Sequence, residues 1–232
     1  MKLHNLLKVY DNVDAFITPS GFLKKKLSEN GFQPGKITCI PTFTASKTEV
    51  GESQVGSYGL YFGRISEEKG VETAIKAYEQ LPDHKLRIMG DDTTDEAVRL
   101  KKYVVENELS NIEFLGFRRG EELEEVIKGA RFTLIPSIWY DNLPNTALES
   151  FQYSKPVIAS DIGSLPELVE DGVNGFLFGP GNPEALREKV LQLDDTALVE
   201  KMGAASRERL ERHFSPEAHY DALMGVFEQV CE

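Results

Sequence analysis

The stretch "RFTLIPSIWYDNLPNTALES", residues 131–150, decides the fold of this chain. Its apolar start, residues 131–136, predicts a buried strand, and a helix is expected to begin at Pro144 or Asn145. Asp141 stands in the loop between them, and Glu149 lies about one turn inside the helix. A strand that runs through a short loop into a helix is one unit of a parallel α/β sheet, which binds ligands beyond the carboxyl ends of its strands.

The same alternation of strand and helix extends over the rest of the chain. Strands are expected at residues 13–18, 37–41, 58–62, 85–89, 112–115, 131–136, 156–160 and 176–178. Helices are expected at residues 20–30, 70–80, 94–108, 183–192 and 215–231. Most of the strand segments are continuous apolar runs, as is typical of strands covered on both faces. The fold class predicted is therefore α/β with a doubly wound, Rossmann-like parallel sheet.

Composition divides the chain into unequal parts. Residues 45–57 are polar and without period, which predicts a linker between a small β-α-β piece, residues 1–44, and a sheet domain, residues 58–214. The small piece has too few elements to bury a core by itself. We expect it to pack on the last helix, within residues 215–232, and to mediate self-association or the docking of a partner domain. The apolar face assigned to that helix consists of Leu223, Val226, Phe227 and Val230.

Charge and cysteine content restrict the class of protein. The 232 residues carry 26 lysines and arginines against 38 acidic residues, a net charge of -12, so nucleic acid is not expected as a partner. No run approaches the roughly 18 apolar residues of a membrane span. Two distant cysteines, Cys39 and Cys231, fit a reducing compartment. The sequence therefore predicts a cytoplasmic protein.

Glycines and cations follow the strands where a ligand is expected. The strand segments run directly into Gly63, Gly90 and Gly116, where the missing side chain lets a ligand approach the backbone. Each could also be an ordinary tight turn, but three in one sheet favour a site. Arg64 and Lys69, in "GRISEEKG" after the first of these strands, suit a diphosphate. The alternative, that both cations pair with the neighbouring glutamates of that loop, is equally consistent with the spacing.

The two carboxylates, Asp141 and Glu149, suit hydroxyl groups rather than phosphate. A helix start with free backbone N–H groups is an anion site, and a carboxylate beside it accepts two hydrogen bonds from a vicinal diol. The pattern therefore fits a sugar on one side and a ribose on the other. In the alternative interpretation, Asp141 caps the helix or a turn and Glu149 only complements the helix dipole. The spacing alone narrowly favours this alternative.

Three motifs carry a resemblance to a known family: residues 63–70, residues 135–178 and "GNPEALREKV" at residues 181–190. In order and spacing they resemble the nucleotide-sugar-binding half of retaining GT-B glycosyltransferases of family 4, over residues 58–232. Residues 1–44 resemble the end of that fold's acceptor-binding domain, whose bulk is missing. The family contributes a histidine near the donor sugar from the missing part, and no histidine of this chain lies on a predicted donor loop.

The resemblance implies transfer of a hexose-type sugar from a UDP- or GDP-sugar to a glycan, a lipid-linked molecule or a small molecule. It implies catalytic roles for Arg64, Lys69 and Asp141, with the cations on the diphosphate and Asp141 on the donor sugar. Glu149 would bind the ribose. The remaining donor contacts implied are Gly63, Asn142, Leu143, Pro144, Asn145 and Thr146 around the phosphates, and Gly116, Phe117 and Arg118 beside the base. No metal or other cofactor is expected.

One departure from the family pattern concerns Asp141, which stands where the motif has a glutamate. The side chain is one methylene shorter, which withdraws the carboxylate. We interpret this as a change in how the donor sugar is contacted, not as a loss of function. The expected partner for activity is an acceptor domain on a separate chain, or a second copy of this chain. A non-catalytic nucleotide-sugar-binding subunit is the alternative function. An unrelated dinucleotide-binding domain is disfavoured, because no G-x-G-x-x-G follows the first strand of the sheet.

Overall fold

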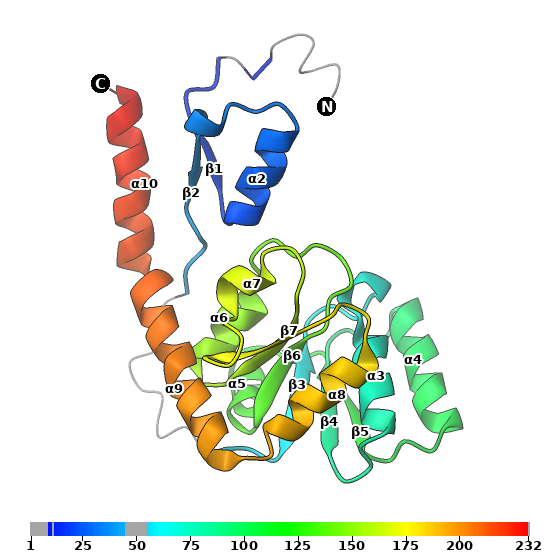
Figure 1. The fold of residues 1–232 in the computed structure, drawn as a ribbon. Coiled ribbons are helices and arrows are strands. Elements are labelled where there is room, and N and C mark those ends of the chain that lie inside the picture. The colour runs from blue at the N-terminus through cyan, green and yellow to red at the C-terminus, as the bar shows by residue number, and fades with distance from the viewer. Residues whose placement is uncertain (1–8, 11, 45–54, 232) are drawn as a thin grey trace.

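The computed structural model describes residues 9–10, 12–44 and 55–231, and most of this part of the chain is built on one parallel sheet (Figure 1). Its six strands lie in the order β5-β4-β3-β6-β7-β8. Their bounds are β3 (Tyr58–Phe62), β4 (Lys85–Met89), β5 (Ile112–Gly116), β6 (Phe132–Ile135), β7 (Val157–Ser160) and β8 (Gly175–Phe178). The doubly wound parallel fold expected from the sequence is confirmed, and its strand order reverses between β3 and β6.

Helices cover both faces of the sheet (Figure 1). Their bounds are α3 (Val71–Glu79), α4 (Asp95–Glu106), α5 (Glu121–Lys128), α6 (Asn145–Gln152), α7 (Leu165–Leu168), α8 (Pro183–Gln192), α9 (Thr196–His213) and α10 (Pro216–Cys231). Successive side chains of β3 enter different clusters: Leu60 and Phe62 pack towards α5, while Tyr61 packs with α3 and α4. This alternation on fully buried strands explains the continuous apolar runs in the sequence.

The helices predicted from N-cap residues are present. Ser20, Thr94 and Asn182 each accept a hydrogen bond from the backbone three residues further on. Three helices, α5, α7 and α9, were not predicted. In α9 the interior glycine, Gly203, weakens the helical pattern, and the structure shows why glycine stands there. A Cβ atom at Gly203 would lie 2.2 Å from the carbonyl oxygen of Ser154, so only glycine lets α9 approach this closely.

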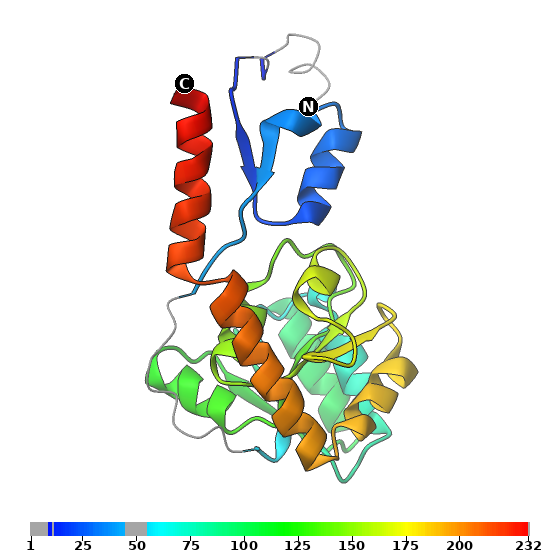
Figure 2. The same cartoon turned by 60° about the vertical axis from the view of Figure 1, so that its left-hand side comes forward.

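The N-terminal segment forms a separate two-stranded parallel sheet, as expected for a β-α-β piece (Figure 2). It consists of β1 (Phe16–Thr18), α2 (Gly21–Glu29), a 3-10 turn (Pro34–Lys36) and β2 (Ile37–Cys39). We call residues 12–44 the small unit. Most of the predicted linker, residues 45–54, lies outside the described residues, and the predicted domain boundaries stay predictions.

The small unit contacts the start of α10, where the expected packing of the two segments is confirmed. The ring Nδ1 of His219 bonds the carbonyl of Pro41 at 2.8 Å, and the ring of Phe43 lies 4.8 Å from that of His219. The apolar face assigned to α10 was only partly right. Val226 is buried and Leu223 half-buried, but Phe227 and Val230 are exposed. The contact is therefore a narrow one near the beginning of the helix.

A second contact joins the small unit to the main sheet through the first turn of α2. The two carboxylate oxygens of Glu167, on α7, accept hydrogen bonds from the backbone N–H groups of Gly21 and Phe22, at 2.8 and 2.6 Å. The Ser20 hydroxyl donates to the Oδ1 atom of Asn142, in the loop after β6, at 2.7 Å. A carboxylate at a helix N-terminus satisfies free N–H groups and complements the dipole. We call these five residues the α2 junction.

The α2 junction predicts that Glu167→Ala loosens the first turn of α2. Hydrogen bonds to a charged group contribute about 1.5–3 kcal/mol, so losing them should speed amide exchange at Gly21 and Phe22 about tenfold or more. Hydrogen-exchange mass spectrometry of the peptide that covers these residues measures this. Glu29→Ala is the matched control, because Glu29 lies on the same helix and pairs only with Lys26 in the described structure. Equal exchange rates in the two variants would contradict the junction.

Candidate functional site

The candidate site lies at the carboxyl edge of the sheet, where the strand order reverses between β3 and β6. In open α/β sheets this switch point is where loops diverge and leave a crevice. Here the loops after β3 and β6 also bond to each other, because the Ile138 N–H donates to the carbonyl of Glu68 at 3.0 Å. Gly70 allows this approach, since a Cβ atom there would lie 2.0 Å from the Pro136 carbonyl oxygen. The two motifs singled out in the sequence therefore form one site.

A pocket of about 350 Å³ opens at this edge. Its lining consists of Phe62, Gly63, Arg64, Met89, Gly90, Asp91, Phe117, Arg118, Leu123, Thr146 and Glu149. The pocket brings together six of the predicted binding residues: Gly63, Arg64, Phe117, Arg118, Thr146 and Glu149. Phe62, Met89, Asp91 and Leu123 were not predicted, because their positions give no chemical signal until the strand ends are placed side by side. Of the other predicted residues, Gly116 ends β5 with a φ of +69° and does not line the pocket.

The strand-end glycines have different explanations. Gly90 is required by packing alone, since a Cβ atom there would lie 2.1 Å from the carbonyl oxygen of Gly63. Gly63 itself has room for a side chain, but its φ of +143° lies in a region that L residues rarely adopt. The tight-turn interpretation therefore suffices for Gly90, while Gly63 places backbone without a side chain in the pocket wall, in a conformation that other residues rarely adopt.

Glu149 supplies a carboxylate whose hydrogen-bonding capacity is unused within the described structure. It is half-buried on α6, and no described residue forms a hydrogen bond or ion pair with its side chain. Burial raises the pKa of this carboxyl group, with no nearby charge to offset the effect. A buried carboxylate without a partner is costly unless a ligand supplies donors. Glu149 is therefore the strongest candidate in the pocket for binding a group with several hydroxyls.

Asp141 and Lys69 form an ion pair beside the pocket, at the junction of the two loops. One carboxylate oxygen of Asp141 accepts from the Lys69 ammonium and the other from the Ser137 hydroxyl. The alternative in which Asp141 caps the helix is wrong, because α6 begins at Asn145, its N-cap residue is Pro144, and no side chain caps it. The other alternative was that both cations pair with the glutamates of their own loop. It holds only for Arg64, which pairs with Glu68 at 3.0 Å.

The loop after β6 is held by side chains from the following elements. Leu143 has a φ of +57°, and its N–H donates to the Ser164 hydroxyl at 2.7 Å, so the expected phosphate contact of this amide is not available in this conformation. The side chain of Asn142 is likewise occupied, by Ser20. The first-turn N–H groups of Asn145 and Thr146 have no intrahelical acceptor. These two amides, rather than that of Leu143, are free to form the anion site that the sequence predicts at this helix start.

Ser137 and Ser164 are functional candidates that the sequence analysis missed. Ser137 orients the Asp141 carboxylate, and Ser164 links the Leu143 amide to the Asp141 carbonyl, to which its hydroxyl donates at 2.8 Å. Ser137 lies four residues before Asp141, a spacing that could have been examined. Nothing in the sequence links Ser164 to this loop, because the contact depends on how β7 places the segment that follows it.

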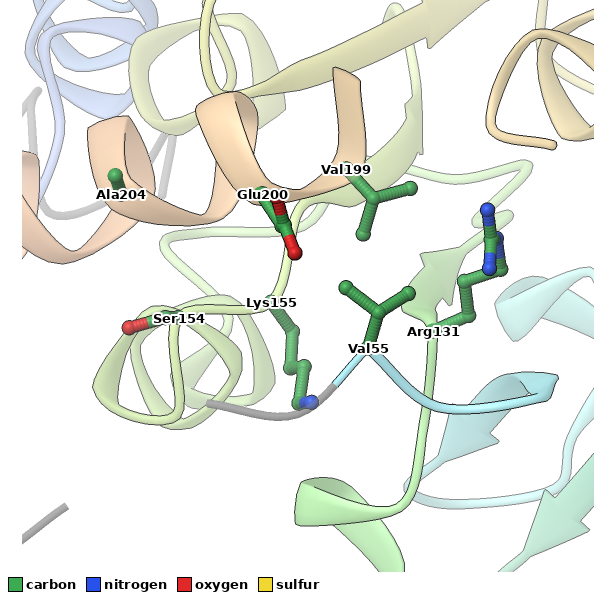
Figure 3. Close-up of a pocket in the computed structure, with 7 residues that line it drawn as sticks. All are labelled: Val55, Arg131, Ser154, Lys155, Val199, Glu200 and Ala204. Carbon is green, nitrogen blue, oxygen red and sulfur yellow. The ribbon is translucent and has the colours of Figure 1, made fainter. Parts of the chain in front are cut away.

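A second pocket, of about 160 Å³, lies at the opposite edge of the sheet, around Lys155 (Figure 3). Figure 3 shows its lining: Val55, Arg131, Ser154, Lys155, Val199, Glu200 and Ala204. The Lys155 side chain is 2% exposed, and burial lowers its pKa to about 8. A lysine this deeply buried is a structural element of this edge, and it lies too far from the switch point to serve the first site.

Within residues 9–10, 12–44 and 55–231, no helix has the length and apolar character needed to cross a membrane. In the same residues, no group of three histidine, cysteine, aspartate or glutamate side chains is arranged to hold a metal ion. The expectation that the reaction needs no metal stays a prediction, since the cations and the start of α6 would have to stabilise the phosphates.

An open parallel sheet, with a pocket and a free helix start at its switch point, is the arrangement of a ligand-binding, doubly wound α/β protein. The chain belongs to the family of glycosyl transferases group 1, whose model matches residues 46–209. It is 30% identical over 223 residues to the uncharacterized glycosyltransferase MJ1178 of Methanocaldococcus jannaschii, covering 95% of this chain and 61% of that protein. It is 30% identical over 218 residues to the glycogen synthase of Mycobacterium tuberculosis, covering 87% of this chain and 50% of that protein. The chain thus spans between half and two thirds of these relatives.

Solved structures confirm the GT-B type of fold. A glycosyltransferase from Rickettsia africae superposes with a TM-score of 0.87 at 20% identity, over 97% of this chain and 66% of that one. Anabaena Alr3699/HepE in complex with UDP-glucose superposes with a TM-score of 0.83 at 20% identity, over 99% of this chain and 67% of that one. Because these matches cover almost all of this chain, the small unit and α10 are part of the shared architecture.

The buried Lys155 predicts a pH dependence of stability. Its pKa is near 8 when folded and 10.5 when exposed, so between these values the unfolded state binds more protons and stability rises with pH. Relative to Lys155→Met, the wild type should gain roughly 1–3 kcal/mol across this window. Urea unfolding at a series of pH values measures the difference, and every other titratable group is common to both proteins. Lys102→Met, at an exposed ion pair, is the control. Parallel pH profiles for wild type and Lys155→Met would refute the assignment.

Proposed function

We propose that this chain is the donor-binding half of a retaining glycosyltransferase, which takes a hexose-type sugar from a nucleoside-diphosphate sugar. The observation that carries the proposal is the unpartnered Glu149 carboxylate, which shares one pocket with Arg64 and the first turn of α6. A ribose diol needs such a carboxylate, and a diphosphate needs the cation and free N–H groups. The membership of the chain in the glycosyl transferase family supports this use of the pocket.

The diphosphate is assigned to Arg64, Lys69 and the amides of Asn145 and Thr146. Arg64 is largely exposed and, among the residues that the structure describes, pairs only with Glu68, so its guanidinium can turn towards phosphate at little cost. Lys69 is less exposed and tied to Asp141, so phosphate would compete for its ammonium. As the glycosidic bond breaks, negative charge grows on the leaving diphosphate, and fixed cations and helix amides stabilise it. This is the step to which the site contributes most.

The nucleoside is assigned to the part of the pocket near Phe117 and Arg118, with the ribose on Glu149. Alr3699/HepE, a protein of the same fold, has been solved with UDP and with UDP-glucose, which favours uridine as the base. A guanosine donor is the alternative. Asp141 is assigned to the donor sugar, and the acceptor is a glycan, a lipid-linked molecule or a small molecule. The proposal includes action in the cytoplasm and no metal or other cofactor.

A second candidate function is a nucleotide-sugar-binding subunit without catalysis. It is favoured by one observation: both carboxylate oxygens of Asp141 are already occupied, by Lys69 and Ser137. The two functions are separated by calorimetric titration with UDP-glucose and GDP-mannose, followed by an assay for release of the nucleotide. Release of UDP or GDP, alone or with an added acceptor domain, supports the enzyme. Tight binding with no release under any of these conditions supports the binding subunit.

The phosphate assignment predicts that Arg64→Ala and Lys69→Ala each weaken UDP binding. Each removes a charge-assisted contact worth roughly 1.5–3 kcal/mol, which corresponds to at least a tenfold loss of affinity. Binding of uridine, which lacks the phosphates, should hardly change. Isothermal titration calorimetry with both ligands provides the measurement. Lys76→Ala is the control, since Lys76 pairs with Glu72 on α3 and does not line the pocket. Equal losses for UDP and uridine would show that these cations act elsewhere.

The division of roles between the two acids gives a further prediction. Glu149→Gln should weaken UDP and UDP-glucose alike, while Asp141→Asn should weaken UDP-glucose much more than UDP. Because burial raises the pKa of Glu149, protonation should weaken UDP binding already at a pH above the range of an ordinary glutamate. The difference in affinity between wild type and Glu149→Gln should therefore shrink as the pH falls. Calorimetry from neutral to mildly acid pH tests this, and a constant difference would contradict the ribose assignment.

A further inference from the structure

The loop after β6 exposes three consecutive large apolar side chains that the donor pocket does not use. Ile138, Trp139 and Tyr140 are 39%, 67% and 53% exposed. None of them lines the donor pocket. Single exposed apolar residues are ordinary on protein surfaces. A run of three in one loop lowers the solubility of the protein and therefore indicates a binding function. We call these three residues the aromatic run.

The aromatic run spans the space between the main sheet and the small unit. At its first end, Ile138 is fixed to the donor side by the hydrogen bond from its N–H to the Glu68 carbonyl. At its other end, the Tyr140 ring lies 5.0 Å from the ring of Phe22, on α2 of the small unit. Trp139 lies between these two anchored residues in the chain, and its ring is 5.9 Å from that of Tyr140 and tilted by 50°. The backbone on both sides of the most exposed ring is thus held in place.

Charged groups surround the aromatic run. The Lys26 ammonium lies 5.9 Å from the Tyr140 ring, and the next residue along the chain, Asp141, pairs with Lys69 at the donor site. A ligand on this surface would therefore meet aromatic faces bordered by hydrogen-bonding groups. A pyranose ring has the matching chemistry, with C–H groups on its faces and hydroxyls around its edge. An acyl chain fits less well, because it needs a larger apolar patch without charges in it.

We propose that Trp139 and Tyr140 form an acceptor subsite, on which a pyranose ring of a carbohydrate acceptor stacks. The inference rests on the proposed function for the identity of the ligand as an acceptor, but not for the binding of the sugar itself. Because Asp141 follows Tyr140 directly, a ring stacked here lies beside the carboxylate assigned to the donor sugar. The subsite draws on both units, since Phe22 of α2 supports the Tyr140 ring. The acceptor is therefore a glycan or a glycoside.

The chain itself provides the probe, because Trp139 is its single tryptophan. The full chain, with and without UDP, is titrated with maltose and with methyl glycosides of glucose, galactose, mannose and N-acetylglucosamine. At least one sugar should shift the tryptophan emission to shorter wavelength and reduce quenching by acrylamide. Tyr140→Ala should weaken that response severalfold. Tyr220→Ala, which removes an equally exposed aromatic ring on α10, should leave it unchanged.

The variants at Trp139 have no tryptophan emission, so their sugar binding is measured by saturation-transfer NMR. Contacts to the C–H protons of the same sugar should fall severalfold in Trp139→Ala and be partly retained in Trp139→Phe. UDP binding by calorimetry should be the same in all of these variants, which also shows that they fold.

Four outcomes overturn or separate the proposals. If UDP binds but no sugar of the panel changes the emission, the subsite does not exist. A response to UDP-glucose alone, without one to free sugars, assigns the aromatic run to the donor and overturns the inference. A response only to phosphatidylcholine–phosphatidylglycerol vesicles assigns it to lipid and also overturns it. If sugars bind and neither UDP nor GDP does, the proposed function fails while the sugar subsite stands.

Discussion

The reversal of strand order between β3 and β6 is the constraint on which the site depends. The two strands pair in parallel, with Gly59 opposite Phe132 and Tyr61 opposite Leu134, so they end at the same height. Their connections then turn to opposite sides of the sheet, towards α3 and α6, and leave a gap that neither main chain fills. The pocket, the free start of α6 and the Glu149 carboxylate all follow from that geometry.

The loop after β6 is held in place by side chains from three other segments of the chain. Ser137 and Lys69 fix the Asp141 side chain, Ser164 fixes the Leu143 amide, and Ser20 fixes Asn142. Leu143 adopts a positive φ, which a branched side chain disfavours, and it persists because it is buried and its N–H is bonded. The fixed backbone of this loop leaves the α6 amides and the pocket side chains free for a ligand. The side chains of Lys69 and Asp141 would have to exchange their present contacts in order to bind one.

Features that depend on the local sequence pattern could be predicted from the sequence, and features that depend on contacts between distant segments could not. The strands are predictable because burial on both faces produces unbroken apolar runs in the sequence. The start of α6 is predictable because Pro144 stands directly before its first helical residue. Contacts between distant segments are not. Lys69 bonds Asp141 rather than the adjacent Glu67 or Glu68, since η2, the 3-10 turn Glu67–Lys69, directs its ammonium across to the other loop. The candidate site residues could thus be identified from residue type and position in the sequence. Their hydrogen-bond and ion-pair partners could not, because these depend on which loops the sheet topology brings together.

The stretch that leaves the small unit, residues 41–44, lies beside the stretch that joins α9 to α10, residues 214–216 (Figure 2). The Thr44 N–H donates to the Phe214 carbonyl at 3.2 Å where the two stretches meet. Because these two stretches are bonded to each other, the position of the small unit is set from both of them rather than by residues 41–44 alone. The Tyr140 ring, which packs on Phe22 of the small unit, is therefore placed by contacts on both sides of this junction.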